Sequence, residues 1–472
     1  MAEAARVFHT TTFVPSFNSL HKTQKPKPSF VSRSTVRRKF QSLRCSSSLE
    51  SATTAMTTNN QEVRWGCDID SPENALALQK WLSDCGLPPQ KMGIEKVEVG
   101  ERGLVALKNI RKGEKLLFVP PSLFITADSV SEIMKKYSVP DWPLIATYLI
   151  SEASLEKSSK WSNYIAALPR QPYSLLYWTR AELDRYLEAS QIRERAIERI
   201  NNVIGTYDDL RLRIFSKHPQ LFPEEVFNIE SFKWSFGILF SRLVRLPSMD
   251  GRVALVPWAD MLNHSCEVFI SYGKKSNGEL LLSYGFVPRE GTNPSDSVEL
   301  PFSLKKSDKC YKEKLEALRK HGLSGSHCFP IRVTGWPQEL IAYAYLAVSP
   351  PSMIGQFEEI AAAASNKTAM KKDKPYPEIE EQALQFILDS CESSISKYTK
   401  FLQASGSMDL DVTSPKQINR RLFLKQLAVD LCNSERRILY RAQAVLRRRL
   451  RDMRSGELKA LNLFDGLRNL FK

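Results

Sequence analysis

The densest group of chemically active side chains lies just past the middle of the chain. Asp260, Asn263 and His264 are followed by two tyrosines, Tyr272 and Tyr284, so that all five fall within 25 residues of otherwise apolar sequence. Carboxylate, amide, imidazole and phenol groups can together bind a polar ligand and orient a proton. A second interpretation remains open on spacing alone, in which Asn263 and His264 cap a turn and the tyrosines pack in a core.

Other familiar constellations are absent from the sequence. There is no phosphate-binding loop, no Gly-x-Ser-x-Gly elbow and no His-Glu-x-x-His zinc motif. A cysteine nucleophile at Cys266 activated by His264 is disfavoured, because residues this close in one loop rarely reach the required geometry. The eight cysteines are scattered without a Cys-x-x-Cys pair, which predicts reduced thiols and neither a zinc module nor a disulfide scaffold.

The composition is that of a globular protein. The 472 residues include 42% hydrophobic and 25% charged residues, which excludes disorder throughout and predicts two or three domains. The longest apolar run, residues 340–348, is shorter than the ~20 residues that span a bilayer, so we expect no membrane span.

The net charge of +15 has two local sources. Residues 4–49 contain nine Lys/Arg and fourteen Ser/Thr but no acid, which predicts an organelle transit peptide over residues 1–50 and a polar linker over 51–68. Only one arginine lies in the first twenty residues, which favours the chloroplast stroma over the mitochondrion. Residues 435–454 add eight arginines on a helix with an apolar stripe, for which we expect a packed helix with a solvated basic face. The remainder is nearly neutral, which disfavours nucleic acid as a partner.

The elements that would position these side chains follow from local patterns. Pro72 starts a helix that ends before Gly86, and Asn228 is the expected N-cap of another. Short strands are expected at 103–107 and 115–120, then helices from 127 to 245, a β-rich patch over 253–286, and a largely helical remainder with helices at 336–348, 378–402 and 434–454.

An ordered set of motifs resembles the SET-domain protein methyltransferases, in particular the plant Rubisco large-subunit lysine methyltransferase family. The set is Glu101-Arg102-Gly103-Leu104-Val105-Ala106, then Asp260-x-x-Asn263-His264-Ser265, then Tyr272, then Tyr284-Gly285-Phe286, supported by Trp161-x-x-Tyr164 and Phe236-Gly237-Ile238-Leu239-x-Ser241-Arg242. The resemblance covers roughly residues 69–460.

The resemblance implies an α+β fold class. A SET-domain β core over 69–296, with a long helical insertion at about 127–245, would be followed by a mainly α-helical, substrate-binding-like domain over 297–472. The core would be knotted, with S-adenosyl-L-methionine bound on one face and the target side chain on the other.

The resemblance also assigns roles to individual residues. Gly100, Glu101 and Arg102 would offer backbone groups to the cofactor, Arg242 would approach its carboxylate, and Asn263 and His264 would hold its amino and adenine ends. Tyr272 and Tyr284 would be the catalytic tyrosines lining a lysine channel, with Ser241 and Asp260 nearer the substrate. No metal is required.

Methyl transfer from a sulfonium to an amine needs an uncharged amine and in-line approach, and positioning alone supplies about 7–11 kcal/mol of barrier lowering. An apolar channel disfavours the protonated amine by desolvation. The expected function is S-adenosylmethionine-dependent lysine methylation of a stromal protein, such as Rubisco large subunit or plastid aldolase, by a monomer.

One departure from the family keeps other functions open. Family members carry a strand-containing segment between Asn-His-Ser and the first tyrosine, whereas here Cys266 is followed within three residues by Phe269. A skipped exon or a faulty gene model would explain this deletion. His264 and Tyr272 are eight residues apart, a reach of about 27 Å at most, so both can still face one site. The alternatives are a catalytically impaired SET-like plastid protein that acts by protein binding, and an enzyme that methylates histidine.

Overall fold

The computed structural model describes residues 63–67, 72–98, 101–115, 117–130, 132–171, 173–262, 272–366, 377–405 and 415–455. The chain divides into two compact units. The first unit comprises Met1–Gln171 with Asn202–Ser271, and the second comprises Pro172–Asn201 with Tyr272–Lys472. The expected transit peptide lies outside the described residues, and the domain limits at 69–296 and 297–472 stay predictions.

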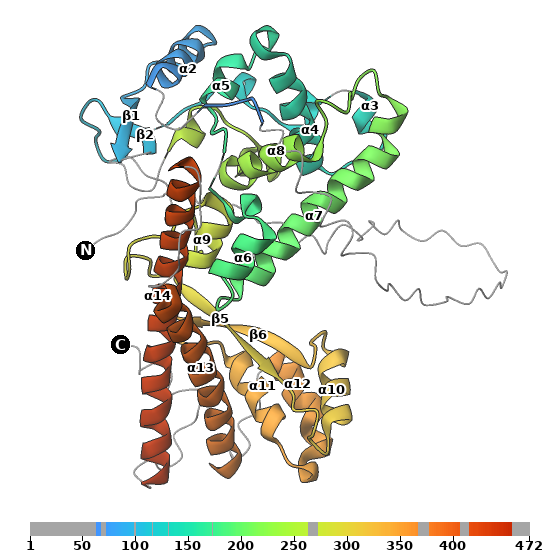
Figure 1. Cartoon of the computed structure of the whole chain (residues 1–472), viewed down its shortest axis with the longest axis vertical. Helices are drawn as coiled ribbons and strands as arrows, with labels where there is room; N and C mark the ends of the chain where they lie inside the picture. Colours follow the sequence, from blue (N-terminus) through green and yellow to red (C-terminus); the bar gives the residue numbers. More distant parts are fainter. Residues whose placement is uncertain are drawn as a thin grey trace, which may run out of the picture. The chain divides into compact units, whose positions relative to one another are not determined.

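The first unit consists of helices and short β-hairpins (Figure 1). Its helices are α2 (Pro72–Asp84), α3 (Glu132–Lys135), α4 (Asp141–Ser154), α5 (Ser162–Ala167), α8 (Ile229–Arg242) and the second half of α7 (Ile192–Arg213). Its strands are β1 (Met92–Glu98), β2 (Glu101–Ala106), β3 (Val244–Leu246) and β4 (Arg252–Ala254). Both strand pairs, β1–β2 and β3–β4, are antiparallel, and an isolated bridge joins Ile125 to Leu255.

Helix α8 packs against α4 in this unit and is largely buried. The Asn228 side chain accepts a hydrogen bond from the Ser231 amide, which confirms the predicted N-cap. Phe232, Trp234 and Phe236 are fully buried on the helix that follows. The buried aromatic face fixes the far end of α8, where Ser241 and Arg242 lie.

The strand expectations in this unit are half right. The strand at 103–107 is confirmed as part of β2, and its partner β1 was not predicted. No strand forms over the described residues of 115–120. Pro120 and Pro121 end this segment, and prolines supply no N–H for a ladder.

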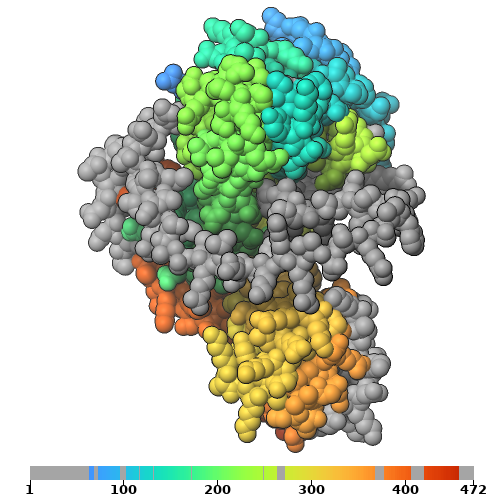
Figure 2. Space-filling model, turned by 90° about the vertical axis from the view of Figure 1, so that its right-hand side faces the viewer, coloured from blue at the N-terminus to red at the C-terminus, as the bar shows by residue number. Residues whose placement is uncertain are grey.

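The second unit combines helices with one strand pair. Its elements are α6 (Arg180–Tyr186), the first half of α7, α9 (Asn277–Tyr284), β5 (Ser297–Ser303), α10 (Tyr311–Lys320), β6 (Ser326–Arg332), α11 (Gln338–Val348), α12 (Phe357–Ala364), α13 (Pro377–Ser405) and α14 (Pro415–Arg454). The β5–β6 hairpin with α10, α11 and α12 forms a lobe whose surface runs from yellow to orange in Figure 2.

Two expectations fail in this unit. The β-rich patch predicted over 253–286 is wrong at residues 277–284, which form the helix α9, while residues 263–271 lie outside the described residues. Ser276 and Glu279 make a capping box at its start, and a short apolar run cannot be assigned to helix or strand by periodicity alone. The β5–β6 hairpin lies in a region expected to be largely helical.

Helices α13 and α14 pack as an antiparallel pair. The predicted apolar stripe of α14 is confirmed, since Leu439, Leu446 and Leu450 are buried. Two arginines of its exposed basic face pair with acids of α13, Arg447–Glu392 at 2.8 Å and Arg454–Glu381 at 2.7 Å. The solvated face that we predicted is wrong at Arg449, which is buried and pairs with the buried Glu380 at 3.2 Å. Helix α14 also begins nineteen residues before the predicted start at residue 434.

None of the helices in the described part of the chain is both long and apolar enough to cross a bilayer.

Candidate functional site

The predicted site residues are divided between the two units. Gly100, Asn263 and His264 lie outside the described residues. Glu101 and Arg102 open strand β2, so the backbone groups assigned to the cofactor lie at the start of a strand, next to a bulge in β1.

The first unit gathers three predicted residues with a fourth that was not among them. We call Tyr164, Ser241, Arg242 and Asp260 the Asp260 cluster. The Tyr164 hydroxyl donates to Asp260 Oδ2 at 2.5 Å, and Arg242 Nη1 donates to Ser241 Oγ at 3.0 Å. The positive charge of Arg242 lowers the pKa of Tyr164 slightly against the larger opposing effects of burial and Asp260, so the two hydrogen-bonded pairs interact electrostatically.

Tyr164 is the site residue that sequence reasoning missed. It is fully buried on α5, and burial followed by the negative charge of Asp260 raises its pKa well above the usual value for tyrosine. The phenol therefore stays protonated and orients the carboxylate as a hydrogen-bond donor. Its only signal in the sequence was the motif Trp161-x-x-Tyr164, and the two partners are 96 residues apart.

Arg242 supplies the feature that fits a cofactor. Its Nε atom is buried and finds no hydrogen-bond partner among the described residues. A buried donor without a partner costs free energy, and a guanidinium matches the geometry of a carboxylate. The carboxylate of S-adenosylmethionine would satisfy this donor.

The turn that leads to Asp260 carries backbone strain. Trp258 has φ 82° and ψ −54°, a conformation that side-chain-bearing residues rarely adopt, and it is almost fully buried. The Met261 amide bonds to the Trp258 carbonyl at 3.1 Å, so the turn is tight. Strain of this kind clusters at functional sites, which accords with the position of Asp260 two residues later.

The second unit brings the two predicted tyrosines together. The ring centroids of Tyr272 and Tyr284 are 4.3 Å apart with planes tilted by 36°, and Phe286 lies 6.1 and 6.2 Å from them. Contacts between aromatic rings contribute favourably beyond the area they bury. The arrangement makes a compact aromatic group with two phenol hydroxyls.

Tyr284 is held by the end of helix α9. Gly285 caps the helix with φ +84°, and its amide donates to the carbonyls of Leu280 and Leu281. A Cβ at this position would lie 2.5 Å from the backbone carbon of Tyr173. The glycine is therefore required both by the backbone conformation and by close packing.

A comparison with known protein families matches part of the second unit. The family model described as Rubisco LSMT substrate-binding matches residues 305–439, which lie in the second unit.

Similar proteins occur in plants and animals. The chloroplastic Rubisco large-subunit N-methyltransferase of Nicotiana tabacum is 26% identical over 426 residues, covering 81% of this chain and 83% of the relative. The Pisum sativum protein of the same name is 30% identical over 294 residues, covering 53% of this chain and 59% of the relative. The Homo sapiens actin-histidine N-methyltransferase is 27% identical over 313 residues, covering 57% of this chain and 52% of the relative.

Solved structures show the same fold. Rubisco LSMT bound to AdoMet superposes with a TM-score of 0.63 at 24% identity, covering 85% of this chain and all of the other. The LSMT SET domain bound to lysine and AdoHcy gives the same TM-score and covers 84% of this chain. The ligands of these structures agree with the cofactor expected from the sequence.

The fold is therefore that of a SET-domain protein, and the expected α+β class is confirmed. Within that class, the matches confirm the resemblance found in the sequence, because the chain is similar to Rubisco large-subunit methyltransferases in sequence and in fold.

Proposed function

We propose that this chain is an S-adenosylmethionine-dependent protein-lysine N-methyltransferase that acts on a chloroplast stromal protein, such as Rubisco large subunit or plastid aldolase. The observation that carries the proposal is the close stacking of Tyr272 on Tyr284, which places two phenol groups side by side. The similarity to chloroplastic plant methyltransferases supports both the reaction and the compartment.

The chain's own residues account for binding and orientation. When bound, the cofactor supplies a methyl group on a positively charged sulfur. Arg242 would donate to its carboxylate, and Asn263 and His264 are proposed to hold its other polar ends. A phenol hydroxyl of the tyrosine pair would accept a hydrogen bond from an N–H of the incoming amine and so orient the amine nitrogen.

The amine must also arrive uncharged. Aromatic rings around the target nitrogen disfavour the ammonium form by desolvation, so the free base is favoured there. Asp260, oriented by Tyr164, is proposed to contact the polar backbone or side chain of the substrate. The shape of the substrate-binding-like region then sets which protein is methylated.

Histidine is the second candidate target. The actin-histidine methyltransferases match 57% of this chain at 27% identity. Lysine takes precedence because the Nicotiana tabacum relative matches over 81% of the chain and 83% of its own length.

The short join between His264 and Tyr272 supports the non-catalytic alternative, a SET-like plastid protein that acts by binding. Sequencing the transcript across codons 266–269 tests this. A longer product would show that the present chain is a shortened form. A single product of the present length would show that the short segment between His264 and Tyr272 is native.

Cofactor binding tests the assignment of Arg242. Arg242→Ala is expected to weaken the binding of S-adenosylmethionine, measured by titration calorimetry, by about 10- to 100-fold, because a charge-assisted bidentate contact is lost. Arg245→Ala is the matched control, since that arginine lies three residues on and is exposed. Equal affinities for the two variants would remove Arg242 from the cofactor site.

A further inference from the structure

Two arginines of α7 bind two residues of α9 at the same spacing. Arg195 Nη2 donates to Glu279 Oε1 at 3.1 Å, and Arg199 Nη1 donates to Ser283 Oγ at 2.9 Å. Residues four apart lie on one face of a helix, so the two contacts are successive rungs between facing helices. All four residues belong to the second unit.

Gly278 of α9 also lies against α7 before the first rung. A Cβ at Gly278 would lie 3.3 Å from the side chain of Ile192, so a larger residue would require Ile192 to give way. Close approach at Gly278 and the two rungs together fix the register and the rotation of α9. The rotation of α9 in turn sets the direction of Tyr284, its last residue.

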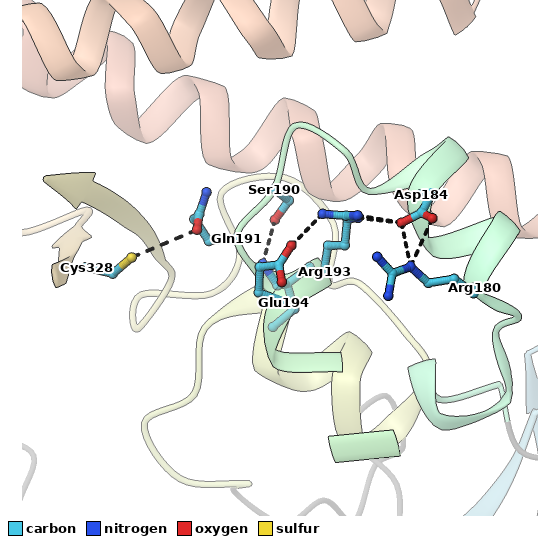
Figure 3. A network of polar contacts seen from close by, with 8 residues as sticks. Arg180, Asp184, Ser190, Gln191, Arg193, Glu194 and Cys328 are labelled. Atoms are coloured by element: carbon cyan, nitrogen blue, oxygen red, sulfur yellow. Dashed lines mark hydrogen bonds and ion pairs between the residues drawn. The ribbon is translucent and has the colours of Figure 1, made fainter. Parts of the chain in front are cut away.

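The part of α7 that carries the arginines is itself anchored, as Figure 3 shows. Arg193 Nε donates to Asp184 Oδ1 at 2.8 Å, and the Ile192 amide donates to Ser190 Oγ at 3.3 Å. These contacts hold the start of α7 in place, and α7 in turn holds α9 through Arg195 and Arg199.

Arg199 is the unusual member of this pair. It is only 6% exposed, and burial lowers its pKa to about 10, which still leaves it charged at neutral pH. The nearby charge of Arg195 also lowers this pKa, while attraction to Glu279, Tyr284 and Glu198 raises it. Burying a charge costs free energy that an apolar side chain would not cost, so a role beyond packing is indicated.

The contact of Arg199 is made one residue before the tyrosine. Ser283 is 2% exposed, and Arg199 Nη1 also lies 3.5 Å from the Leu282 carbonyl. The guanidinium thus contacts the last turn of α9 at the two residues before Tyr284, and Gly285 ends the helix directly after this tyrosine. We propose that Arg199 is a positioning residue that holds Tyr284, through the last turn of α9, in its stacked place against Tyr272.

The proposal rests on the proposed function for its catalytic consequence but not for its structural part. Two variants of Arg199 test the proposal. Arg199→Met removes the charge and the hydrogen-bond donors at similar side-chain length, and Arg199→Lys keeps the charge but replaces the planar guanidinium with a compact ammonium donor. Ser283→Ala removes the acceptor alone. Arg211→Met is the matched control, because Arg211 lies on the same helix, is exposed and pairs with the exposed Asp208 at 3.9 Å.

Two measurements are made on the full chain. Hydrogen exchange at the Gly285 amide is expected to rise about tenfold in Arg199→Met, less in Arg199→Lys, and not at all in Arg211→Met. For methyl transfer to the protein substrate, kcat is expected to fall on the order of 10- to 100-fold in Arg199→Met, with KM within about twofold and partial recovery in Arg199→Lys.

Unchanged exchange at Gly285 in Arg199→Met would overturn the proposal, whether or not the chain transfers methyl groups. So would faster exchange with an unchanged kcat in an active enzyme. If Arg199→Met fails to fold, Arg199→Lys and Ser283→Ala decide by the same two measurements. A wild-type chain without any transfer would refute the proposed function, while the exchange data would still decide whether Arg199 holds the turn.

Discussion

The rings of Tyr272 and Tyr284 stack at a centroid distance of 4.3 Å, although the two residues come from a loop and from the end of helix α9. This contact places a phenol hydroxyl from each residue in one aromatic group. It is the geometric core of the proposed reaction, and it makes the hydroxyl of Tyr272 the first target for substitution.

Tyr272→Phe keeps the ring contact and removes only the hydroxyl. We expect kcat to fall on the order of 100-fold, with little change in the KM of either substrate, because a positioned hydrogen-bonding group is lost at the reacting centre. Steady-state kinetics measure this. Tyr440→Phe, at an exposed tyrosine of α14, is the control. Equal kcat values for the two variants would take Tyr272 out of the mechanism.

Tyr164→Phe tests the hydrogen bond within the Asp260 cluster. Loss of a donor to a carboxylate in a buried place is expected to lower the free energy of unfolding by about 1.5–3 kcal/mol, measured by urea denaturation. Tyr343→Phe is the comparison, since the buried Tyr343 hydroxyl donates to the neutral backbone carbonyl of Gly325 at 2.8 Å and a cost of about 0.5–1.5 kcal/mol is expected. A smaller loss for Tyr164→Phe than for Tyr343→Phe would show that the 2.5 Å contact contributes little.

Gly285→Ala and Gly113→Ala separate strain from crowding. Both glycines have nearly the same backbone angle, φ +84° and +85°, but a Cβ at Gly113 meets nothing within 4 Å. We expect a cost of about 1–2 kcal/mol at Gly113 from the left-handed conformation alone, and about 3 kcal/mol or more at Gly285. Thermal or urea unfolding gives both values, and similar costs would mean that the contact with Tyr173 relaxes easily.

The described structure shows which parts of the site a sequence can reveal. Local signals were sufficient to predict the Asn228 cap of α8 and the apolar stripe of α14, because caps and periodicity are short-range features. Local signals were not sufficient to identify α9 as a helix, since the same apolar run suits a buried strand or a buried helix. The Tyr164–Asp260 and Arg199–Ser283 contacts join residues 96 and 84 positions apart, and only the tertiary fold brings such partners together.

Glu435 predicts a pH dependence of stability in the second unit. Burial raises its pKa to about 8, while hydrogen bonds from Tyr398 at 2.8 Å and Ser190 at 3.0 Å favour the charged form and limit the rise. The folded chain therefore keeps a proton that the unfolded chain releases above its ordinary pKa of about 4.5. Stability is expected to fall as pH rises from about 5 to about 8, with a slope of up to about 1.4 kcal/mol per pH unit.

Glu435→Gln keeps the shape and removes the titration. The slope of unfolding free energy against pH should flatten in this variant between pH 5 and 8, as measured by urea denaturation at several pH values. Burial also raises the pKa of Asp296 and of Glu380 and lowers the pKa of His327, so the groups left in this variant contribute slopes of both signs. Glu313→Gln, at an exposed residue of α10, should leave the wild-type slope, and equal slopes for Glu435→Gln and the wild type would contradict the assignment.

The central claim is methyl transfer to a lysine of a plastid protein, and one assay tests it most directly. The purified chain is incubated with methyl-labelled S-adenosylmethionine and an extract of plastids that lack the corresponding methyltransferase, and labelled proteins are hydrolysed to amino acids. We predict a labelled protein that yields methyl-lysine, with the label lost in Arg242→Ala and strongly reduced in Tyr272→Phe. Label recovered as methyl-histidine would contradict the lysine assignment, and the absence of label, also from a chain with the longer segment restored after Cys266, would contradict the enzyme itself.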